Sequence, residues 1–506
     1  MNTLNAREAE TLRIVKDTTL THEQAMMKLS KLAEQYVHVF PLPEDFQRLV
    51  ETRQICDLGE GFVPYAPRYI LPDYEKLLES GCKFLRLDPP TNLFEAISAL
   101  EIFYHHVPSV THFPVFIGKL DKLLDRFITD ENEAEAKVLI KSFLRHIDRT
   151  IDDSFCHANI GPEATRAGKL ILEAELELQD AIPGLTLLYD PEITPDDFAT
   201  DCVRTALRCA KPSFADHKTY SQQYTGDYGI ASCYNALPIG GGSYSLTRML
   251  LKNVAVDAHD KQDFFARSLP HAVAVMCEFM DSKVKFLVEE ASFFRSNFLI
   301  TEGFVDPDRF TAMFGVVGLC ECVNLLMEKQ GIEGRFGHSD IADQLGVEVM
   351  EALEALVAAH ENPYCKAFGN RFVLHAQVGI DSDFDTSPGA RIAIGEEPPL
   401  YDHLKQAGLY HRFFPSGVGD IFPFDTTAAR NPESILDIIK GALKVGLRYF
   451  STYSSDSDVI RITGYLVKRS DIEKLDAGTP VSQDTVVLGL GSVKNGHVLE
   501  RKVRSL

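Results

Sequence analysis

Two short segments of the 506-residue chain contain residue types that could carry out hydrogen-atom chemistry. Residues 461–466 read Arg-Ile-Thr-Gly-Tyr-Leu, and residues 228–243 place Cys233 between small residues and a glycine-rich turn. Because glycine has no Cβ, its Cα can flatten after losing an α-hydrogen and share the unpaired electron with both flanking amides. A cysteine thiol releases hydrogen reversibly, since its S–H bond is close in strength to such a weakened C–H bond. Without context, a strand running into a Gly-Tyr turn explains the first segment equally well, and a small buried side chain beside a loop explains Cys233.

Both segments resemble the chemistry-bearing loops of the glycyl radical enzymes. Residues 461–466 resemble the Arg-x-x-Gly-Tyr signature of that family. Residues 228–243 resemble its cysteine-bearing finger loop, most nearly that of the anaerobic ribonucleotide reductases. The two motifs also stand in the family's order. The resemblance implies that Gly464 stores an unpaired electron and oxidises Cys233, whose thiyl radical then abstracts hydrogen from a carbon of the substrate.

Further segments extend the resemblance over roughly residues 200–475. Residues 314–325 resemble the Gly-Leu-x-Glu helix of the anaerobic reductases, the helix from Asp340 matches the next helix there, and residues 447–452 resemble the strand before the radical loop. Taken end to end, the chain looks most like the YjjI family of glycyl radical enzymes. The implied fold is a ten-stranded α/β barrel of two five-stranded halves. Its two chemistry-bearing loops would meet in an interior that excludes water and oxygen.

The chain lacks the residues that mark the well-known reactions of glycyl radical enzymes. Pyruvate formate-lyase has two adjacent cysteines, whereas Tyr234 follows Cys233 here. The diol dehydratases and choline lyase have Cys-x-Glu with the glutamate as base, whereas Asn235 stands at that position. Anaerobic ribonucleotide reductases carry a four-cysteine zinc site before the glycyl motif, whereas no cysteine follows Cys365. The substrate therefore stays open, and nucleotide reduction, C–C or C–N lysis and dehydration are all candidate reactions.

Other polar residues are weaker candidates for the site. Asn235 follows the cysteine loop, and His375 and Gln377 alternate on one face of an expected strand, so all three side chains could contact a substrate. A core histidine with satisfied hydrogen bonds is the commoner explanation of His375. A Gly- and Phe-rich loop that could line the site is flanked by Asp420, Asp425 and Arg430.

The resemblance also implies partners and working conditions. A separate radical-SAM activating enzyme, with an iron–sulfur cluster and S-adenosylmethionine, would remove the hydrogen from Gly464. The protein itself would hold no permanent cofactor, would be anaerobic and oxygen-sensitive, and would form a homodimer, as is common in this family. The alternative from another class is a non-catalytic protein that binds a metabolite or a partner on the same scaffold, because a fold does not determine a function.

The elements that must position these residues fall into two regions. Residues 1–200 read as a mainly helical N-terminal region packed on an α/β barrel core over residues 201–506. In the first region, a capping box at Thr21-His-Glu-Gln opens a helix. Apolar residues at helical spacing predict the helices 25–37, 135–147 and 165–181.

From residue 201 onward, helices alternate with short apolar strands, which favours a mainly parallel sheet or barrel. The expected elements include a helix at 340–360, a strand at 371–377, a helix from Asn431-Pro432 to before Gly446, and a strand at 447–453. The C-terminal end reads as a β-hairpin, with arms at 485–493 and 497–503 around a Lys-Asn-Gly turn.

Composition excludes several other classes of protein. The 51 basic and 73 acidic residues give a net charge of −22 without any basic block, which argues against a nucleic-acid polymer as partner. A small anionic substrate stays possible, because a pocket can differ in sign from the whole molecule. The ten cysteines are scattered without a C-x-x-C pair, so no thiolate metal site is expected. The N-terminus lacks a signal peptide and no apolar run is long enough to span a membrane, so we expect a cytoplasmic protein.

Overall fold

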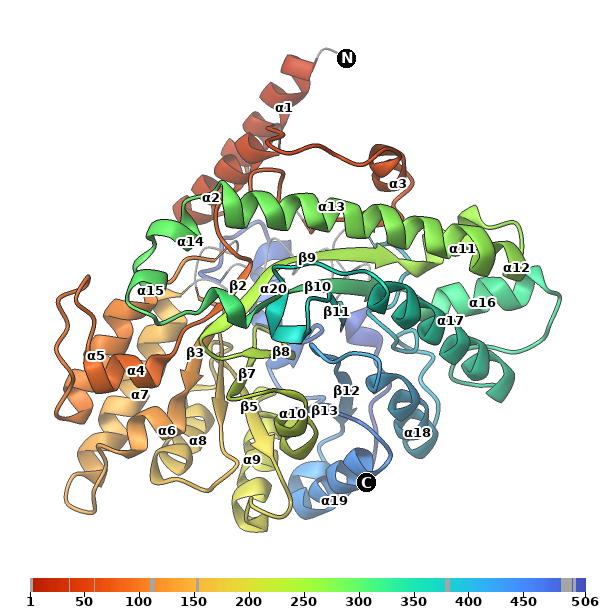
Figure 1. Ribbon diagram of the computed structural model, residues 1–506. Helices are drawn as coiled ribbons and strands as arrows, with labels where there is room; N and C mark the ends of the chain where they lie inside the picture. The colour runs from red at the N-terminus through yellow and green to blue at the C-terminus, as the bar shows by residue number, and fades with distance from the viewer. Residues whose placement is uncertain are drawn as a thin grey trace.

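The structure of the protein is a computed structural model, which describes residues 3–35, 37–58, 60–109, 114–151, 154–377, 383–483, 494 and 497–506. Within these ranges, the strands form a five-stranded sheet, a six-stranded sheet and two two-stranded hairpins. Figure 1 shows the strands in the middle of the molecule with helices around the outside.

The five-stranded sheet has the order β1-β9-β10-β11, with β2 also paired to β9. Its strands are β1 (Ile55–Cys56), β2 (Tyr69–Leu71), β9 (Gly241–Leu250), β10 (Phe310–Val317) and β11 (Val373–Ala376). Strands β9, β10 and β11 run parallel, whereas β1 and β2 run antiparallel to β9. Every residue of β10 is buried, as is typical of a parallel strand that is covered on both faces.

The six-stranded sheet has the order β12-β13-β6-β5-β4-β3. Its strands are β3 (Phe116–Lys119), β4 (His157–Ile160), β5 (Gly184–Tyr189), β6 (Ser213–Asp216), β12 (Asp420–Phe424) and β13 (Tyr449–Ser454). All neighbouring pairs are parallel except β13 and β6. Strands β3, β4 and β5 come from residues 1–200, the region expected to be mainly helical, and the parallel pairing of β5 with β6 connects them to the region after residue 200.

These sheets confirm an α/β fold with mainly parallel strands. The two sheets approach each other where β11 ends, since the N–H of Ala376 donates to the carbonyl of Gly417 ahead of β12 (3.0 Å). The ten-stranded barrel stays a prediction.

The helices predicted at 25–37, 135–147, 165–181, 340–360 and from Asn431-Pro432 are all present, within a few residues of the expected bounds. They are α1 (Thr3–Val15), α2 (His22–Glu34), α3 (Phe46–Glu51), α4 (Tyr74–Ser80), α5 (Leu93–Tyr104), α6 (Leu120–Asp125), α7 (Glu133–Thr150), α8 (Arg166–Leu178), α9 (Asp196–Cys209), α10 (His217–Gln223), α11 (Leu251–Asp257), α12 (Lys261–Asp263), α13 (Leu269–Glu289), α14 (Phe293–Ser296), α15 (Phe298–Thr301), α16 (Leu319–Lys329), α17 (Asp340–Ala358), α18 (Leu400–His411), α19 (Pro432–Lys444) and α20 (Arg469–Asp476). The capping box at Thr21 is confirmed: its hydroxyl accepts from the N–H of Gln24, whose side chain accepts from the N–H of Thr21.

The predicted C-terminal hairpin is wrong in its second arm. Residues 485–493 lie outside the described residues. In residues 497–503 the structure has a 3₁₀ turn at Val498–Glu500 in place of a strand. Arg504 then forms an isolated parallel bridge with Phe424 at the end of β12. The chain end is thus held by the six-stranded sheet, which the local pattern of the sequence does not encode.

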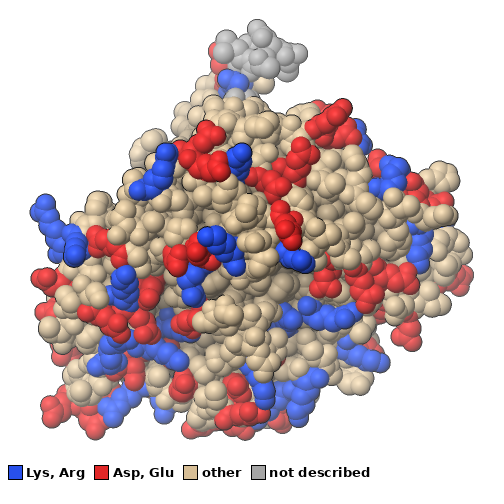
Figure 2. All heavy atoms as spheres, in the orientation of Figure 1, with Lys and Arg blue, Asp and Glu red and all other residues tan. Residues whose placement is uncertain are grey.

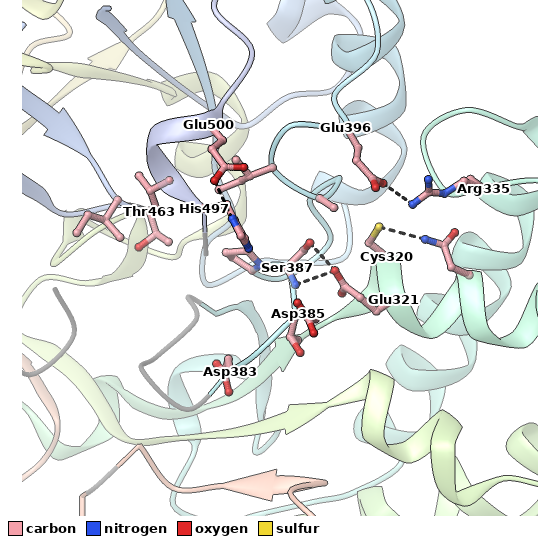
Figure 3. Close-up of a pocket in the computed structure, with 17 residues that line it drawn as sticks. Cys320, Glu321, Arg335, Asp383, Asp385, Ser387, Glu396, Thr463, His497 and Glu500 are labelled. Carbon is pink, nitrogen blue, oxygen red and sulfur yellow. Dashed lines mark hydrogen bonds and ion pairs between the residues drawn. The ribbon is translucent and has the colours of Figure 1, made fainter. Parts of the chain in front are cut away.

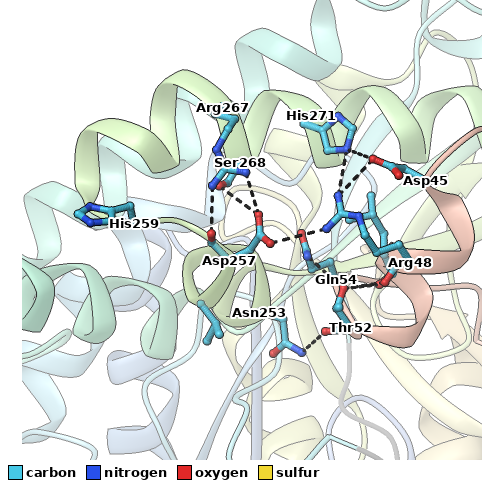
Figure 4. A network of polar contacts seen from close by, with 12 residues as sticks. Asp45, Arg48, Thr52, Gln54, Asn253, Asp257, His259, Arg267, Ser268 and His271 are labelled. Carbon is cyan, nitrogen blue, oxygen red and sulfur yellow. Dashed lines mark hydrogen bonds and ion pairs between the residues drawn. The ribbon is translucent and has the colours of Figure 1, made fainter.

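A network of polar side chains fixes the N-terminal segment to the helices beside β9 (Figure 4). Asp45, next to α3, accepts from Arg48 (3.3 Å) and contacts His271 on α13 (3.0 Å). Arg48 also lies 3.7 Å from Asp257 at the end of α11, which Arg267 binds at 3.1 Å. These side chains are partly exposed, and exposed ion pairs contribute little stability. The network therefore connects α3 with α11 and α13 but adds little stability.

The surface mixes both signs of charge. On the face drawn in Figure 2, lysine and arginine side chains are interspersed with aspartate and glutamate. Within the ranges described above, no helix combines the length and the apolar character needed to cross a lipid bilayer.

Candidate active site

Cys233 lies at the tip of a β-hairpin, which we call the finger hairpin (residues 228–238). Its strands are β7 (Tyr228–Ala231) and β8 (Asn235–Pro238). Cys233 is 5% exposed, and Ser232 before it adopts a left-handed φ of 61°, which turns the chain at the tip. The hairpin is fixed from β4, where the buried amide of Asn159 exchanges two hydrogen bonds of 2.8 Å with the backbone of Ile230.

Gly464 lies in a second hairpin, which we call the glycyl loop (residues 459–468). Strands β14 (Val459–Arg461) and β15 (Leu466–Lys468) flank the loop. The buried guanidinium of Arg461 donates from Nη1 to the carbonyl of Gly464 (2.9 Å) and from Nε to the carbonyl of Ala210 (2.8 Å). Arg501, from the C-terminal segment, donates to the carbonyls of Arg461 and Ile462. Two arginines therefore hold the backbone of the loop.

The two hairpins meet at their tips. A Cβ built on Gly464 would lie 2.0 Å from the Cβ, 2.8 Å from the Cα and 3.0 Å from the Sγ of Cys233. No side chain fits at such distances, so the close approach requires glycine at position 464. The tertiary structure thus brings the two residues that the sequence singles out into direct contact.

The thiol of Cys233 is protonated near neutral pH. Burial raises the pKa of Cys233 to about 12, against smaller opposing effects of the Ser232 hydroxyl, the charges of Arg461 and Arg391, and the N–H of Gly464. A nucleophilic cysteine needs a lowered pKa, because the thiolate is the reactive species. Cys233 instead keeps its S–H bond, which suits exchange of a hydrogen atom with a neighbouring carbon.

A buried chain of hydrogen bonds fixes the backbone at the tip of the finger hairpin. The hydroxyl of Tyr449 on β13 donates to the carbonyl of Cys233 (2.9 Å) and lies 3.0 Å from the hydroxyl of Thr186. The Nε2 atom of His157 lies 2.7 Å from the same threonine hydroxyl. Burial lowers the pKa of His157 to about 3, so the imidazole is neutral. With its proton on Nε2, the neutral ring of His157 would donate to Thr186, whose hydroxyl could then donate to Tyr449.

Of the weaker candidates, Asn235 lies in the finger hairpin and His375 lies beside it. Asn235 is buried as the first residue of β8. His375 is buried on β11, with its ring stacked on Tyr234 at a centroid distance of 5.7 Å, and burial lowers its pKa to about 3. Nδ1 of His375 lies 3.2 Å from the carbonyl of Ser416, so a hydrogen bond within the core accounts for much of the position of this ring. Gln377 is also buried, directly after β11.

The three charged residues around residues 420–430 separate in the structure. Asp420 is buried and lies 3.3 Å from Nε2 of His403, whereas Asp425 forms the turn after β12 and Arg430 is exposed. In the part of the chain that the structure describes, no group of three or more His, Cys, Asp or Glu side chains is arranged to hold a metal ion.

Sequence reasoning missed two arginines near the finger hairpin. The guanidinium of Arg391 lies over the ring of Tyr234, at 5.6 Å from its centroid. The guanidinium of Arg68 lies over the ring of Tyr69 at 5.3 Å, and its charge lowers the pKa of His375. Neither arginine stands in a recognisable motif, and each is far from Cys233 in sequence. No local signal could therefore have found them.

A cavity of about 380 Å³ borders the glycyl loop (Figure 3). It is lined by Thr463, the residue before Gly464, and by Glu321 on α16. Ser387 donates to Glu321 from its backbone N–H (2.9 Å) and its hydroxyl (2.6 Å). The other carboxylate oxygen of Glu321 and the hydroxyl of Thr463 are buried without a hydrogen-bond partner in the described residues. The cavity thus reaches the residue next to Gly464 and presents polar groups there.

Solved structures with the same fold include enzymes of different chemistry. A structure from Roseburia inulinivorans described for 1,2-propanediol dehydration has a TM-score of 0.68 at 9% identity, covering 98% of this chain and 88% of that one. The anaerobic ribonucleotide reductase from Thermotoga maritima has a TM-score of 0.63 at 12% identity, covering 94% and 89%. At these identities the likeness shows the fold alone.

Sequence comparisons identify the family. An uncharacterized protein of Haemophilus influenzae is 43% identical over 499 residues, which cover 97% of each chain. The uncharacterized protein YjjI of Escherichia coli is 40% identical over 501 residues, covering 99% of this chain and 96% of that one. The family described as "Glycyl radical enzyme YjjI-like" matches residues 20–504. The resemblance carried by the two loops is confirmed, and the chain belongs to the YjjI-like family of glycyl radical enzymes.

Proposed function

We propose that Gly464 stores the unpaired electron and that Cys233 passes the radical to the substrate. The observation that carries this proposal is the contact between the two hairpin tips, where a Cβ on Gly464 would lie 3.0 Å from Sγ of Cys233. The glycyl Cα radical takes the hydrogen atom of the thiol, which restores the glycine and leaves a thiyl radical on Cys233. The thiyl then takes a hydrogen atom from a substrate carbon, so that the S–H bond reforms and a carbon radical remains on the substrate.

The protonation state and the surroundings of Cys233 support this relay. The raised pKa keeps the transferable hydrogen on sulfur, and the anchored carbonyl of Cys233 keeps the thiol at the glycine. The radical would be stored within the core, away from water and oxygen. We further propose that the two sheets are the halves of a barrel around these tips, supported by the Ala376–Gly417 hydrogen bond between their edges.

Activation would come from a partner. A radical-SAM enzyme, supplying the iron–sulfur cluster and S-adenosylmethionine, would remove one α-hydrogen from Gly464. Because the glycine is enclosed by Cys233 and held by Arg461, the glycyl loop would have to move to meet that enzyme. We propose a homodimer as the working assembly by analogy with the family alone. The proposed substrate is a small molecule.

Electron paramagnetic resonance after anaerobic activation tests the radical site. The wild type should give a doublet, because the unpaired electron on Gly464 couples to the one remaining α-hydrogen. Gly464→Ala should give no such signal, and air should cleave the activated wild-type chain at this position. A doublet that persists in Gly464→Ala, or a wild type that never gives one, would show that the radical is not stored there.

Deuterium exchange tests the relay without knowledge of the substrate. In D₂O the thiol of Cys233 becomes S–D, so reversible transfer should replace the α-hydrogen of Gly464 and collapse the doublet to a singlet. Cys233→Ser should keep the doublet in D₂O, because the exchangeable thiol hydrogen is gone. Cys277→Ser is the matched control, because Cys277 is equally buried on α13 with a pKa also raised to about 12. Collapse of the doublet in Cys233→Ser would rule out the relay.

A further inference from the structure

The cavity of about 380 Å³ beside the glycyl loop is lined by two polar atoms that lack a hydrogen-bond partner among the described residues (Figure 3). One is Oε2 of Glu321 on α16, and the other is the hydroxyl oxygen of Thr463, the residue before Gly464. Thr463 is only 4% exposed. Buried polar atoms are normally hydrogen-bonded, because leaving one unsatisfied costs free energy. The two atoms therefore point to an occupant of the cavity that completes their hydrogen bonds.

Glu321 brings a carboxyl group to this cavity without a basic partner. In the part of the chain that the structure describes, no salt bridge joins Glu321 to a lysine, arginine or histidine. Burial raises the pKa of Glu321, against smaller opposing effects of Ser387, the backbone N–H of Glu321 and the charge of Lys252. Lys252 is engaged elsewhere, since its Nζ donates to the carbonyl of Asp385 (2.9 Å). A cation beside Oε2 would therefore offset the cost of burying this carboxylate.

Carboxylates outnumber cations on the wall of the cavity. The carboxylates on the wall are Glu321, Asp383, Asp385, Glu396 and Glu500, and the basic residues are Arg335 and His497. Both basic residues are already paired, since Arg335 binds Glu396 (2.5 Å) and His497 lies 2.9 Å from Glu500. Asp383 is neutralised from outside the wall, where Arg53 and Arg248 bind it. The wall therefore keeps a negative character, to which Glu321 and Asp385 contribute.

The rest of the wall is apolar and comes from separate parts of the chain. Ile462 belongs to the glycyl loop, Val498 to the C-terminal segment, and Pro388 and Ile394 to the segment between β11 and α18. Small-molecule sites in proteins typically measure about 300–1,000 Å³ and combine apolar walls with a few polar groups, and this cavity fits that description. It is thus suited to a ligand with an apolar body and one polar end.

The charge of the wall selects the polar end of the ligand. An anionic end would be repelled by the carboxylates, and a neutral hydroxyl would leave the buried charge of Glu321 uncompensated. A protonated amine supplies both the missing charge and N–H donors, because an ammonium group has three donors and no acceptor. Water is the competing occupant, since a polar cavity of this size has room for several water molecules.

We propose that this cavity binds a small molecule with a protonated amino group on an apolar body, and that the ammonium donates to Oε2 of Glu321. The polar end of the ligand also satisfies the hydroxyl of Thr463. Among the described residues Cys233 does not line the cavity, so the site is separate from the thiol and does not depend on the proposed relay. Because the wall joins the glycyl loop to α16, a bound amine would hold the loop against this helix.

Ligand-observed nuclear magnetic resonance titrations of the full-length protein without activation, at neutral pH and constant ionic strength, test this inference. The probes are hexylamine, 1-hexanol as its uncharged counterpart and hexanoate as an anion. Hexylamine should bind with a dissociation constant about tenfold or more below that of 1-hexanol, because a hydrogen bond to a charged group is worth about 1.5–3 kcal/mol. Hexanoate should bind more weakly than both. Equal binding of the amine and the alcohol, or no binding of the amine, would overturn the inference and favour water.

Variants locate the amine. Glu321→Gln keeps an acceptor for Ser387 but removes the charge, so the preference for hexylamine over 1-hexanol should disappear. Thr463→Val removes only the hydroxyl and should weaken the binding of hexylamine by a smaller factor. Asp343→Asn is the matched control, because burial also raises the pKa of Asp343 on α17, which does not line the cavity, and the preference should persist in it.

Circular dichroism checks that the variants fold, and Thr463→Val replaces Glu321→Gln if the latter unfolds. A preference for the amine that survives unchanged in the folded variants would overturn the assignment. Hydrogen exchange measured by mass spectrometry gives a second readout. Saturating hexylamine should slow exchange in the glycyl loop (residues 459–468) and in α16 more than 1-hexanol does, whereas protection confined to other segments would place the amine elsewhere. No radical forms in these experiments, so their outcome is independent of the resonance test.

Discussion

Replacing Gly464 with alanine tests whether the two hairpin tips touch as closely as the structure shows. The new methyl group would lie 2.0 Å from the Cβ and 2.8 Å from the Cα of Cys233. Carbon atoms that are not bonded prefer separations of about 3.5–4.0 Å. The tips would therefore have to move apart by roughly 1.5 Å. Neither tip moves freely, because Tyr449 holds the finger hairpin and Arg461 holds the glycyl loop.

The expected loss of stability in Gly464→Ala follows from this geometry. Overpacking a buried site typically costs about 1–3 kcal/mol, and we expect Gly464→Ala at the upper end of this range. Gly441→Ala is the matched control, since a Cβ there meets nothing within 4 Å and the residue lies inside α19. That substitution should stabilise the protein by about 0.5–1 kcal/mol, because alanine favours the helix over glycine. If any replacement of glycine by alanine lowered the stability of this protein, both Gly464→Ala and Gly441→Ala would be destabilised.

A double-mutant cycle with Cys233→Gly separates the contact from other effects of the methyl group. Removing the Cβ and Sγ of Cys233 clears two of the three atoms that the new methyl group meets. The cost of Gly464→Ala should then fall by at least about 0.5 kcal/mol, as expected for residues in direct contact.

Thermal unfolding without activation, under anaerobic reducing conditions, provides the measurement. A fixed scan rate is needed for the apparent Tm, because large chains commonly unfold irreversibly. The free energies of the double-mutant cycle come from equilibrium unfolding in urea. An unchanged apparent Tm of Gly464→Ala would show that the two tips do not touch as closely as described. So would effects of the two substitutions that add within about 0.3–0.5 kcal/mol.

Two further predictions concern the buried polar groups around the finger hairpin. Tyr449→Phe removes the donor to the fingertip carbonyl and should lower stability by about 1–3 kcal/mol, whereas an unchanged Tm would show that the hydrogen bond is dispensable. His157, His375 and His411 each have a pKa of about 3 in the folded protein against about 6.5 unfolded, so the unfolded chain binds more protons between these values. Stability should therefore fall as the pH drops below about 6.5. Each of these histidines should contribute up to roughly 1.4 kcal/mol of loss per pH unit. The fall should be shallower in His375→Asn, and equal slopes in wild type and variant would contradict the assignment.

Local features of the fold were largely predictable. The capping box at Thr21 opens α2, and Pro432 stands at the first position of α19, because the signals for a helix end lie within a few residues of it. Strand partners were not predictable in the same way. Strands β3–β5 join β6 across residue 200, since pairing depends on segments that are distant in the chain. For the same reason the end of the chain folds against β12 rather than forming its own hairpin.

The candidate site shows the same contrast between features encoded locally and features that depend on distant segments of the chain. The two residues that we propose to carry the chemistry could be found from the sequence alone, because Gly464 and Cys233 each stand in a short motif. Folding was needed to show that these residues touch, that burial keeps the proton on the thiol, and that Arg391 lies over the ring of Tyr234, the residue after Cys233. The physical reason is that bond strengths and conformational freedom belong to a residue and its neighbours. Burial and electrostatic potential are instead created by segments that only folding brings together.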